Sequence, residues 1–181
     1  ARAVVEIAKS DKSKADILRK QWSRMTDTHQ FMRLTSKLKM NRLGAYRIAG
    51  KPFVKALAPW ALNDALIALG QADIEVMVFV GNRGCIQIHT GLINTVKPMG
   101  PWQNVIDPLF NLHLRTDHVA EVWAVEKPTK RGLAISIEAF DQYGALILQM
   151  FGLRKESDMV DHTEAFRALI GTLPTLHSED A

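Results

Sequence analysis

The spacing of apolar residues along the chain changes once, near residue 71. Before that point apolar residues recur every three or four positions, which is the spacing of one face of an α-helix. After it, short runs of alternating apolar and polar residues are separated by Gly, Pro, Asn and Asp, as in antiparallel strands joined by tight turns. The pattern therefore predicts an α+β domain in which N-terminal helices pack on one or two antiparallel β-sheets.

Five helices are predicted, four of them in the N-terminal part, at residues 11–24, 27–40, 41–50, 59–69 and 163–173. In the second helix Asp27 is expected to be the N-cap, and Gln30 three residues later is expected to complete a capping box. Phe31, Leu34 and Leu38 form the stripe that this helix should bury. In the third helix Asn41 is the expected cap and Gly50 the expected end.

Strands are predicted between these helices and in the second half of the chain, at residues 53–57, 74–80, 85–89, 92–96, 102–106, 110–114, 120–126, 133–140 and 145–151. Gly81-Asn82-Arg83-Gly84 is a strong hairpin signal, and a further turn is expected at Pro98-Met99-Gly100-Pro101. The length suits a single domain covering residues 1–181, with residues 175–181 as a frayed tail.

Composition narrows the function classes. The net charge is only +4, with 23 basic and 19 acidic residues, so a nucleic-acid partner is not indicated and small anionic ligands fit equally well. The single cysteine, Cys85, excludes a disulfide framework and a Cys-rich zinc site, and its place among alternating strand residues predicts a buried thiol. No apolar run approaches the ~18 residues of a membrane span and the start lacks a signal-peptide pattern, so a cytoplasmic location is expected. Because the chain begins at Ala1, it is expected to be a fragment or a trimmed product.

The most informative candidate for chemistry is His29. At about 100° per residue it lies roughly 200° from Phe31, away from the buried stripe of its helix. It is also in the first turn, where the positive end of the helix dipole disfavours imidazolium and leaves a nitrogen lone pair available. The pattern fits a metal-ligating histidine and also a solvated or capping histidine. A second arrangement, a three-histidine metal site, would use His89, His113 and His118.

Three basic residues lie at the ends of predicted elements, where pockets are commonly lined: Arg42, Lys127 and Arg154. Each one alone could be a surface charge. If they converged near His29, they would surround a metal ligand with cations that bind carboxylates. That combination suits iron porphyrin, which needs an axial imidazole, apolar walls and basic residues for two propionates.

Several sequence strings then carry a family resemblance, and they occur in this order: Trp22-x-x-Met25-Thr26-Asp27-x-His29-Gln30-Phe31, Val78-Phe79-Val80-Gly81-Asn82-Arg83-Gly84-Cys85-Ile86-Gln87-Ile88, Asn111-Leu112-His113-Leu114, Lys127-Pro128-Thr129 and Gly152-x-Arg154. Together they closely resemble the C-terminal half of the bacterial haemin-uptake and haem-degrading proteins of the HemS/ChuS/HmuS type. The resemblance runs from about Asp16 to Arg154. It implies a HemS-like half as the fold and haem as the cofactor.

The resemblance also implies roles for single residues. His29 would be the proximal haem-iron ligand, and Arg42, Lys127 and Arg154 would contact the propionates. Phe151 stands where the family usually has a tyrosine, and Leu153 where it usually has a glutamine, so one hydroxyl contact to haem is missing. Family members hold two similar halves in one chain, with haem between them and a distal arginine from the first half. This chain would then be a homodimer or would lack its N-terminal half.

Three functions follow. The first is cytoplasmic haem binding and trafficking in haem iron utilisation, with an inner-membrane haem importer or a downstream haem acceptor as partner. The second is oxidative haem degradation using O₂ and an external electron donor, so enzymatic activity is left open. The third is an interaction module that uses the basic N-terminal helices to bind a protein or nucleic acid, although no nucleic acid is expected as partner.

Overall fold

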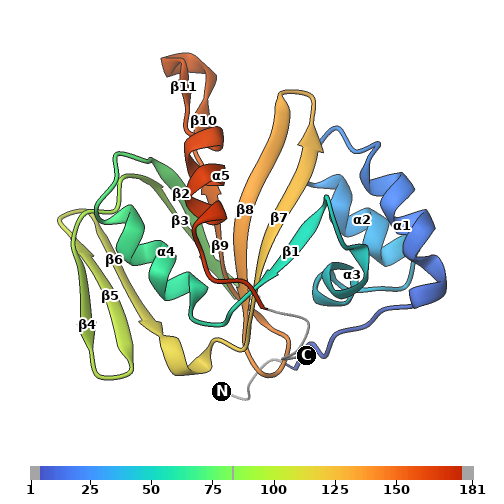
Figure 1. Ribbon diagram of the computed structural model, residues 1–181, viewed down its shortest axis with the longest axis horizontal. Helices are drawn as coiled ribbons and strands as arrows, with labels where there is room; N and C mark the ends of the chain where they lie inside the picture. Colours follow the sequence, from blue (N-terminus) through green and yellow to red (C-terminus); the bar gives the residue numbers. More distant parts are fainter. Residues whose placement is uncertain (1–4, 83, 177–181) are drawn as a thin grey trace.

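The computed structural model describes residues 5–82 and 84–176. Within these residues the chain forms five α-helices and eleven strands (Figure 1): α1 (Ala15–Trp22), α2 (Gln30–Lys37), α3 (Arg42–Ala49), α4 (Ala61–Leu69) and α5 (Thr163–Gly171); β1 (Val54–Leu57), β2 (Val76–Gly81), β3 (Ile86–Gly91), β4 (Val96–Met99), β5 (Trp102–Asp107), β6 (Phe110–Arg115), β7 (Glu121–Thr129), β8 (Gly132–Phe140), β9 (Leu146–Gly152), β10 (Arg154–Lys155) and β11 (Val160–Asp161). The predicted α+β class is confirmed.

The strands form three antiparallel sheets. The largest has six strands in the order β1-β7-β8-β9-β2-β3, and β4-β5-β6 and β10-β11 form two smaller sheets. Figure 1 shows α1–α3 at one end of the molecule and β4–β6 at the other, with the six-stranded sheet between them. The six-stranded sheet therefore separates the N-terminal helices from the β4–β6 sheet.

One face of the six-stranded sheet, which we call the closed face, carries the main core. Strand register places a set of apolar side chains on it: Val76, Val78, Ile135, Ile137, Leu148 and Met150. They pack against the apolar residues of α4 and α5, and all of them are buried. The apolar residues that alternate along the strands and those that recur at helical spacing in α4 thus pack together in one hydrophobic layer.

The opposite face, which we call the open face, is covered only in part. Its side chains come from four strands: Lys127 of β7, Ser136 and Glu138 of β8, Gln149 and Phe151 of β9, and Met77 and Phe79 of β2. Helices α1–α3 cover its β7–β8 end with a second core that includes Trp22, Phe31 and Tyr46. At the β2–β3 end Ile86 and Ile88 stay 66% and 57% exposed. The open face is therefore accessible beyond β8.

The N-terminal helices follow the predicted stripes. Phe31, Leu34 and Leu38 are all buried, as the helical spacing predicts. Asn41 caps α3 through its Oδ1 atom, which accepts the Gly44 N–H at 2.9 Å. Gly50 ends the helix at φ 67°, a backbone conformation that glycine adopts without a steric penalty.

Three predictions about the strand region differ from the structure. The strand predicted at residues 92–96 does not form as such: residues 92–95 are not in a strand, and β4 runs from Val96 to Met99. Pro98 lies inside β4 rather than in a turn, which an edge strand tolerates because its outer N–H groups need no partner. Cys85 is exposed rather than buried. It lies in the turn before β3, where its N–H donates to the Asn82 side chain, and β3 is an edge strand whose first three residues are also exposed.

The structure describes the predicted tail only as far as residue 176. Thr175 forms a β-bridge with Leu57, and the Leu176 N–H donates to the Ala56 carbonyl at 3.2 Å, so both residues lie against β1. Residues 177–181 lie outside the described residues. Among the described residues, no helix is long and apolar enough to cross a lipid bilayer.

Candidate functional site

His29 lies in the turn before α2, and its side chain is 95% exposed. The Oδ1 atom of Asp27 accepts the backbone N–H of His29 at 2.8 Å, and the ring Nδ1 lies 2.8 Å from the same oxygen. Because a carboxylate only accepts hydrogen bonds, Nδ1 carries the proton in this contact, and in the neutral ring Nε2 then has the lone pair. Metal-bound histidines are usually oriented by such a carboxylate on the other ring nitrogen.

The predicted capping box is wrong in its partner. Helix α2 begins at Gln30 with His29 at the N-cap position. Gln30 pairs with Thr26, whose N–H donates to Gln30 Oε1 at 2.9 Å and whose hydroxyl accepts from Gln30 Nε2 at 3.1 Å. Asp27 is thereby free to hold His29, and hydrogen bonds from the His29 backbone and then its ring lower the pKa of the Asp27 carboxyl.

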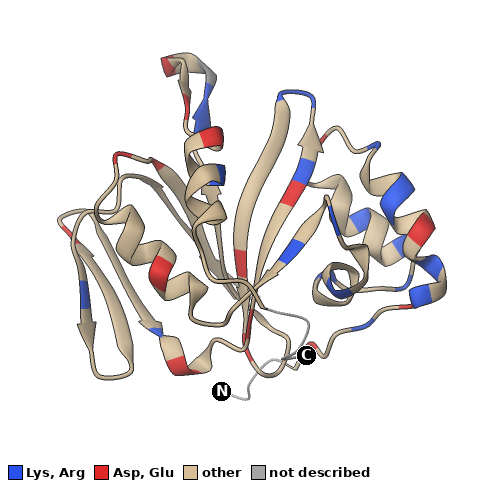
Figure 2. Cartoon of the chain, viewed as in Figure 1, with Lys and Arg blue, Asp and Glu red and all other residues tan. Residues whose placement is uncertain are grey.

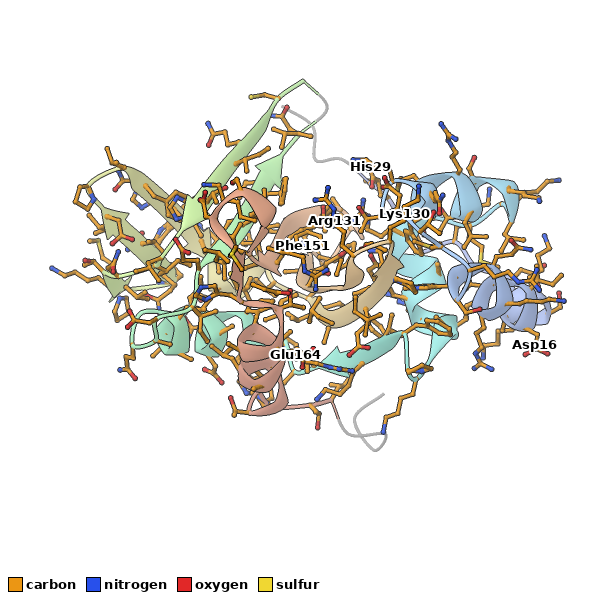
Figure 3. The ribbon with its side chains drawn as sticks, turned by 90° about the horizontal axis from the view of Figure 1, so that it is seen from above. Asp16, His29, Lys130, Arg131, Phe151 and Glu164 are labelled. Atoms are coloured by element: carbon orange, nitrogen blue, oxygen red, sulfur yellow. The ribbon has the colours of Figure 1, made fainter. Side chains whose placement is uncertain are left out.

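The turn that carries His29 is fixed against the β7–β8 hairpin. The Lys130 N–H at the hairpin tip donates to the Thr26 carbonyl at 3.0 Å. In Figure 3 the labelled residues His29, Lys130, Arg131 and Phe151 form a row from the start of α2 towards β9, and Glu164 of α5 lies away from them. The His29 imidazole thus stands at the edge of the open face.

Behind this edge, Glu138 is the centre of a buried polar cluster on the open face. Its carboxylate is fully buried and accepts five hydrogen bonds, from Lys127 Nζ (3.2 Å), Ser136 Oγ (3.1 Å) and Gln149 Nε2 (2.9 Å) on Oε1 and from Arg42 NH1 (3.2 Å) and Tyr46 Oη (2.6 Å) on Oε2. The donors come from α3, β7, β8 and β9. We call this set the Glu138 cluster.

Charge and burial shift the pKa values within the Glu138 cluster. Burial alone would raise the pKa of Glu138, but the Lys127 and Arg42 charges and the Tyr46 and Gln149 hydrogen bonds lower it to about 2. Burial lowers the pKa of Lys127, and the Glu138 charge offsets part of that effect. Burial, followed by the Glu138 charge, raises the pKa of Tyr46 well above its usual value. Glu138 is therefore an anion at neutral pH.

A cavity of about 510 Å³ opens beside the Glu138 cluster on the open face. Arg42 and Gln149 are the cluster members that line it, together with Glu6, Phe79, Gly81, Asn82, Ile86, Asp141, Ala145, Leu146 and Ile147. Arg42 is 22% exposed, and its NH2 atom lies 3.5 Å from the sulfur of Met32 on α2. The cavity thus combines apolar walls with a guanidinium at one side.

Two other predicted site residues, Lys127 and Phe151, lie on the open face but do not line this cavity. Lys127 has a side chain only 4% exposed, and its ammonium sits 4.6 Å from the Phe31 ring centroid. Phe151 is half-buried and meets Phe79 edge-to-face at 5.7 Å, one row nearer β10 than the cavity wall. Arg42, Lys127 and Phe151 therefore share the open face.

Arg154 follows this face at β10 and is held by internal contacts. Its guanidinium donates to Asp161 Oδ2 (3.1 Å), to the carbonyls of Arg131 (2.7 Å) and Leu133 (3.4 Å), and to the Thr163 hydroxyl (3.2 Å). These contacts tie β10 to the β7–β8 hairpin and to α5. These contacts use four of the five N–H groups, so a ligand would reach Arg154 through the remaining NH1 hydrogen or by replacing one of them.

The alternative three-histidine site does not form. His89 stacks on Phe110 at 3.9 Å with Nε2 facing the Leu92 carbonyl, and His113 Nδ1 lies 2.7 Å from Asn104 Oδ1. No group of three His, Cys, Asp or Glu residues in the described chain could hold a metal ion. A porphyrin iron needs only one protein ligand, so His29 is compatible with this finding.

A larger groove of about 780 Å³ lies between α4 and the β4–β6 sheet. Its lining includes Trp60, Trp102 and several prolines but contains no His, Cys, Tyr, Met, Lys or Arg. It thus offers neither an imidazole for iron nor a cation for a carboxylate. The smaller cavity on the open face has the better chemistry for an anionic porphyrin.

Basic residues also surround the open face at long range. Figure 2 shows Lys and Arg concentrated on α1–α3 and at the β7–β8 hairpin tip, whereas Asp and Glu are sparse there. Such a field raises the local concentration of anionic ligands.

Sequence analysis found Arg42 and Lys127 but missed Glu138 and Tyr46. The available signal was an acidic residue in the middle of an otherwise apolar strand, which is rarely buried unless it is paired.

Comparisons with known proteins show the family of the chain. The family model of the haemin-degrading HemS.ChuX domain matches residues 39–173, a range that begins after His29. The hemin transport proteins HemS of Yersinia enterocolitica and HmuS of Yersinia pestis are each 40% identical over 136 residues, 75% of this chain and 39% of theirs. The chain therefore spans well under half the length of these curated relatives.

Solved structures extend the likeness to nearly the whole chain. Holo-PhuS, a heme-binding protein from Pseudomonas aeruginosa, matches with a TM-score of 0.85 and 38% identity over 97% of this chain and 50% of its own. ChuS, an E. coli heme oxygenase, matches with a TM-score of 0.81 and 35% identity over 95% of this chain and 50% of its own. ChuX has the same fold at 14% identity, and the match covers 96% of its chain.

Proposed function

Because the chain belongs to the haemin-degrading HemS/ChuX family, we propose that it binds one haem on its open face with His29 as the axial iron ligand. The observation that carries the proposal is the exposed His29 ring, whose Nδ1 is held by Asp27 while Nε2 is left to bind iron. The haem would extend from His29 across Phe151 towards the 510 Å³ cavity. Phe151 and Phe79 would supply apolar walls.

Arg42, Lys127 and Arg154 stay the proposed sources of positive charge for the propionates. Arg42 is the best placed, since it lines the cavity and is partly exposed. Lys127 adds its charge from within the Glu138 cluster, and Arg154 would contact a propionate through its remaining NH1 hydrogen or in exchange for Asp161. Arg–carboxylate pairs of this kind are strong because both partners are charged.

We propose that the bound haem is carried and passed on, as part of haem iron utilisation in the cytoplasm. HemS and HmuS are hemin transport proteins, and an iron ligand at an exposed edge leaves a short route for transfer to an acceptor. The inner-membrane importer and the downstream acceptor stay predictions.

Haem degradation is the second candidate, because ChuS, 35% identical to this chain, is a heme oxygenase. Adding a reductant in air to the hemin complex, with catalase present, distinguishes the two. Degradation predicts a bleached Soret band with release of a bilin-like product. Transport predicts a stable ferrous complex that passes its haem to apomyoglobin.

A homodimer stays the predicted assembly. The matched region covers 39% of HemS and 50% of PhuS, whereas it covers 96% of ChuX, which therefore consists of one such unit. Light scattering with and without hemin tests this prediction. A monomer in both states would contradict it.

The proposal is tested by titrating hemin into the wild type and into His29→Ala. The wild type should give a shifted Soret band with saturation near one hemin per chain, and His29→Ala should lose or displace that band because iron loses its imidazole. His118→Ala is the matched control, an exposed histidine that does not line the 510 Å³ cavity, and should titrate like the wild type. An unchanged spectrum for His29→Ala would remove His29 from the iron site.

A further inference from the structure

The larger groove lies between one face of α4 and the β4–β6 sheet. At the C-terminal end of α4 the helix and the sheet are in close contact, since a methyl group on Gly70 would lie 3.0 Å from Val96 Cγ2. Towards the start of α4, Trp60, Asn63 and Ile67 recur at helical spacing and line the groove. The groove therefore begins near Val96 and runs along the helix to Trp60.

The opposite wall is one row of residues across the small sheet. Pro98 of β4, Gln103 of β5 and Leu114 of β6 are register partners, and all three line the groove. Among the described residues that line it, Asp117 alone is charged, and its Oδ2 already pairs with Arg115 NH2 at 2.6 Å. The groove therefore favours an uncharged ligand.

Two polar groups of this groove lack a partner. Gln103 is 2% exposed, and its Nε2 donates to Asn63 Oδ1 at 2.7 Å, which joins the sheet to the helix. Its Oε1 is the one buried side-chain oxygen or nitrogen in the described chain that has no hydrogen-bond partner. The indole N–H of Trp60, a residue 61% exposed, finds no acceptor within the described residues either. A buried oxygen without a donor is rare in folded proteins and points to a donor from outside the described chain.

We propose that the groove binds an extended, uncharged segment of another protein, and that Gln103 Oε1 accepts one of its backbone N–H groups. A peptide group supplies what the groove lacks, because it carries an N–H for Gln103 and a C=O for the Trp60 indole. The distance from Trp60 to Ile67 is about 10 Å along a helix, which is the length of about three residues of extended chain. Rotation of the Gln103 carboxamide about its terminal torsion, which has broad minima, would exchange the bond to Asn63 for one to the ligand.

This segment would bind a different part of the molecule from haem. No residue that lines the groove also lines the 510 Å³ cavity of the open face. Figure 1 shows the β4–β6 sheet at the opposite end of the molecule from α1–α3. The inference therefore does not depend on the proposed haem function, and Gln103→Met should titrate hemin like the wild type.

The experiment follows the side-chain N–H signals of Trp60, Asn63 and Gln103 by NMR while capped peptides are added. The probes are acetyl-Ala-X-Ala-amides in which X is Leu, Ile, Phe or Trp, and at least one should shift these signals saturably. For the peptide that binds most tightly, each backbone N–H is replaced in turn by an ester oxygen. One of these esters should bind about tenfold more weakly, because it cannot donate to Gln103.

Gln103→Met keeps the size of the side chain and removes its carboxamide. In this variant the peptide and its esters should bind equally, as reported by the Trp60 indole signal. Gln87→Met, at an exposed glutamine of β3 that does not line the groove, is the matched control and should keep the tenfold difference. Circular dichroism checks that both variants are folded. If Gln103→Met is unfolded, the Gln103 N–H signal of the wild type decides, since the ester that binds more weakly should shift it less.

Three results would overturn the inference. The first is that none of the four peptides shifts the Trp60 and Gln103 signals saturably. The second is that every ester binds the wild type as tightly as its parent peptide, which would mean that the groove accepts any apolar molecule. The third is that the same signals move when the protein alone is diluted, which would show that a second copy of the chain fills the groove.

Discussion

The two faces of the six-stranded sheet are built by the same strands and have opposite character. Along β8, Ile135 and Ile137 enter the closed face beneath α4 and α5, while Ser136 and Glu138 enter the open face. The closed face is apolar and fully covered, and the open face has a buried charge cluster, a cavity and exposed apolar residues. Alternation within one strand thus separates the residues that stabilise the fold from those that form the site.

The largest expected effect is on the free energy of unfolding, when a phenylalanine beneath the closed face, Phe166, and one on the open face, Phe151, are each replaced by alanine. Phe166 of α5 is 0% exposed beneath the closed face, and Phe166→Ala should lower the free energy of unfolding by about 3–5 kcal/mol through lost burial and a cavity. Phe151→Ala, on the half-buried open side, should lower it by only about 1 kcal/mol while weakening hemin binding. Urea unfolding and hemin titration of both variants check this, and equal stability losses would break the comparison.

The next effect is the pH dependence that Glu138 gives to the open face. Its folded pKa of about 2 lies below the ordinary value of 4.5, so its contribution to stability is present above pH 4.5 and is lost as the pH falls towards 2. The difference corresponds to about 3 kcal/mol. Urea unfolding of wild type and Glu138→Gln at several pH values should show this slope in the wild type only. Parallel curves would mean that Glu138 is not held as an anion.

The smallest effect on stability, with a clear effect on binding, is expected at Asp27. Asp27→Asn removes the carboxylate that fixes the Nδ1–H of His29, so hemin affinity should fall about 10- to 100-fold. Because both residues are exposed, the free energy of unfolding should change by no more than about 0.5 kcal/mol. Asp16→Asn is the matched control, an exposed aspartate on α1. Unchanged hemin affinity in Asp27→Asn would show that the His29 orientation does not depend on it.

Sequence patterns predicted the strands and helices better than they predicted which face of the sheet the helices cover. The strand predicted at residues 133–140 forms as β8, and helical spacing correctly put His29 away from the buried Phe31. Which face would be covered depends on where α1–α5 pack, and that depends on contacts between residues far apart in the chain.

The same limit explains the missed cluster. The partners of Glu138 come from positions 42, 46, 127 and 149 as well as its neighbour Ser136, so no local pattern reveals them. The role of Asp27 was misassigned because a cap and a histidine partner look alike in sequence. Lys127 was predicted at the end of a strand, and neither that position nor the family resemblance showed that it lies inside β7 with its ammonium bound to Tyr46 and Glu138.

The central claim is that haem lies on the open face, and backbone-amide NMR with ferric hemin tests it most directly. Paramagnetic iron should broaden the amide signals of residues 29–32 and of Gln149 and Phe151, while zinc protoporphyrin, the diamagnetic control, should leave them visible. The amides of Trp60 and Trp102 beside the larger groove should stay sharp. Broadening confined to Trp60 and Trp102, with sharp signals at residues 29–32, would contradict the account.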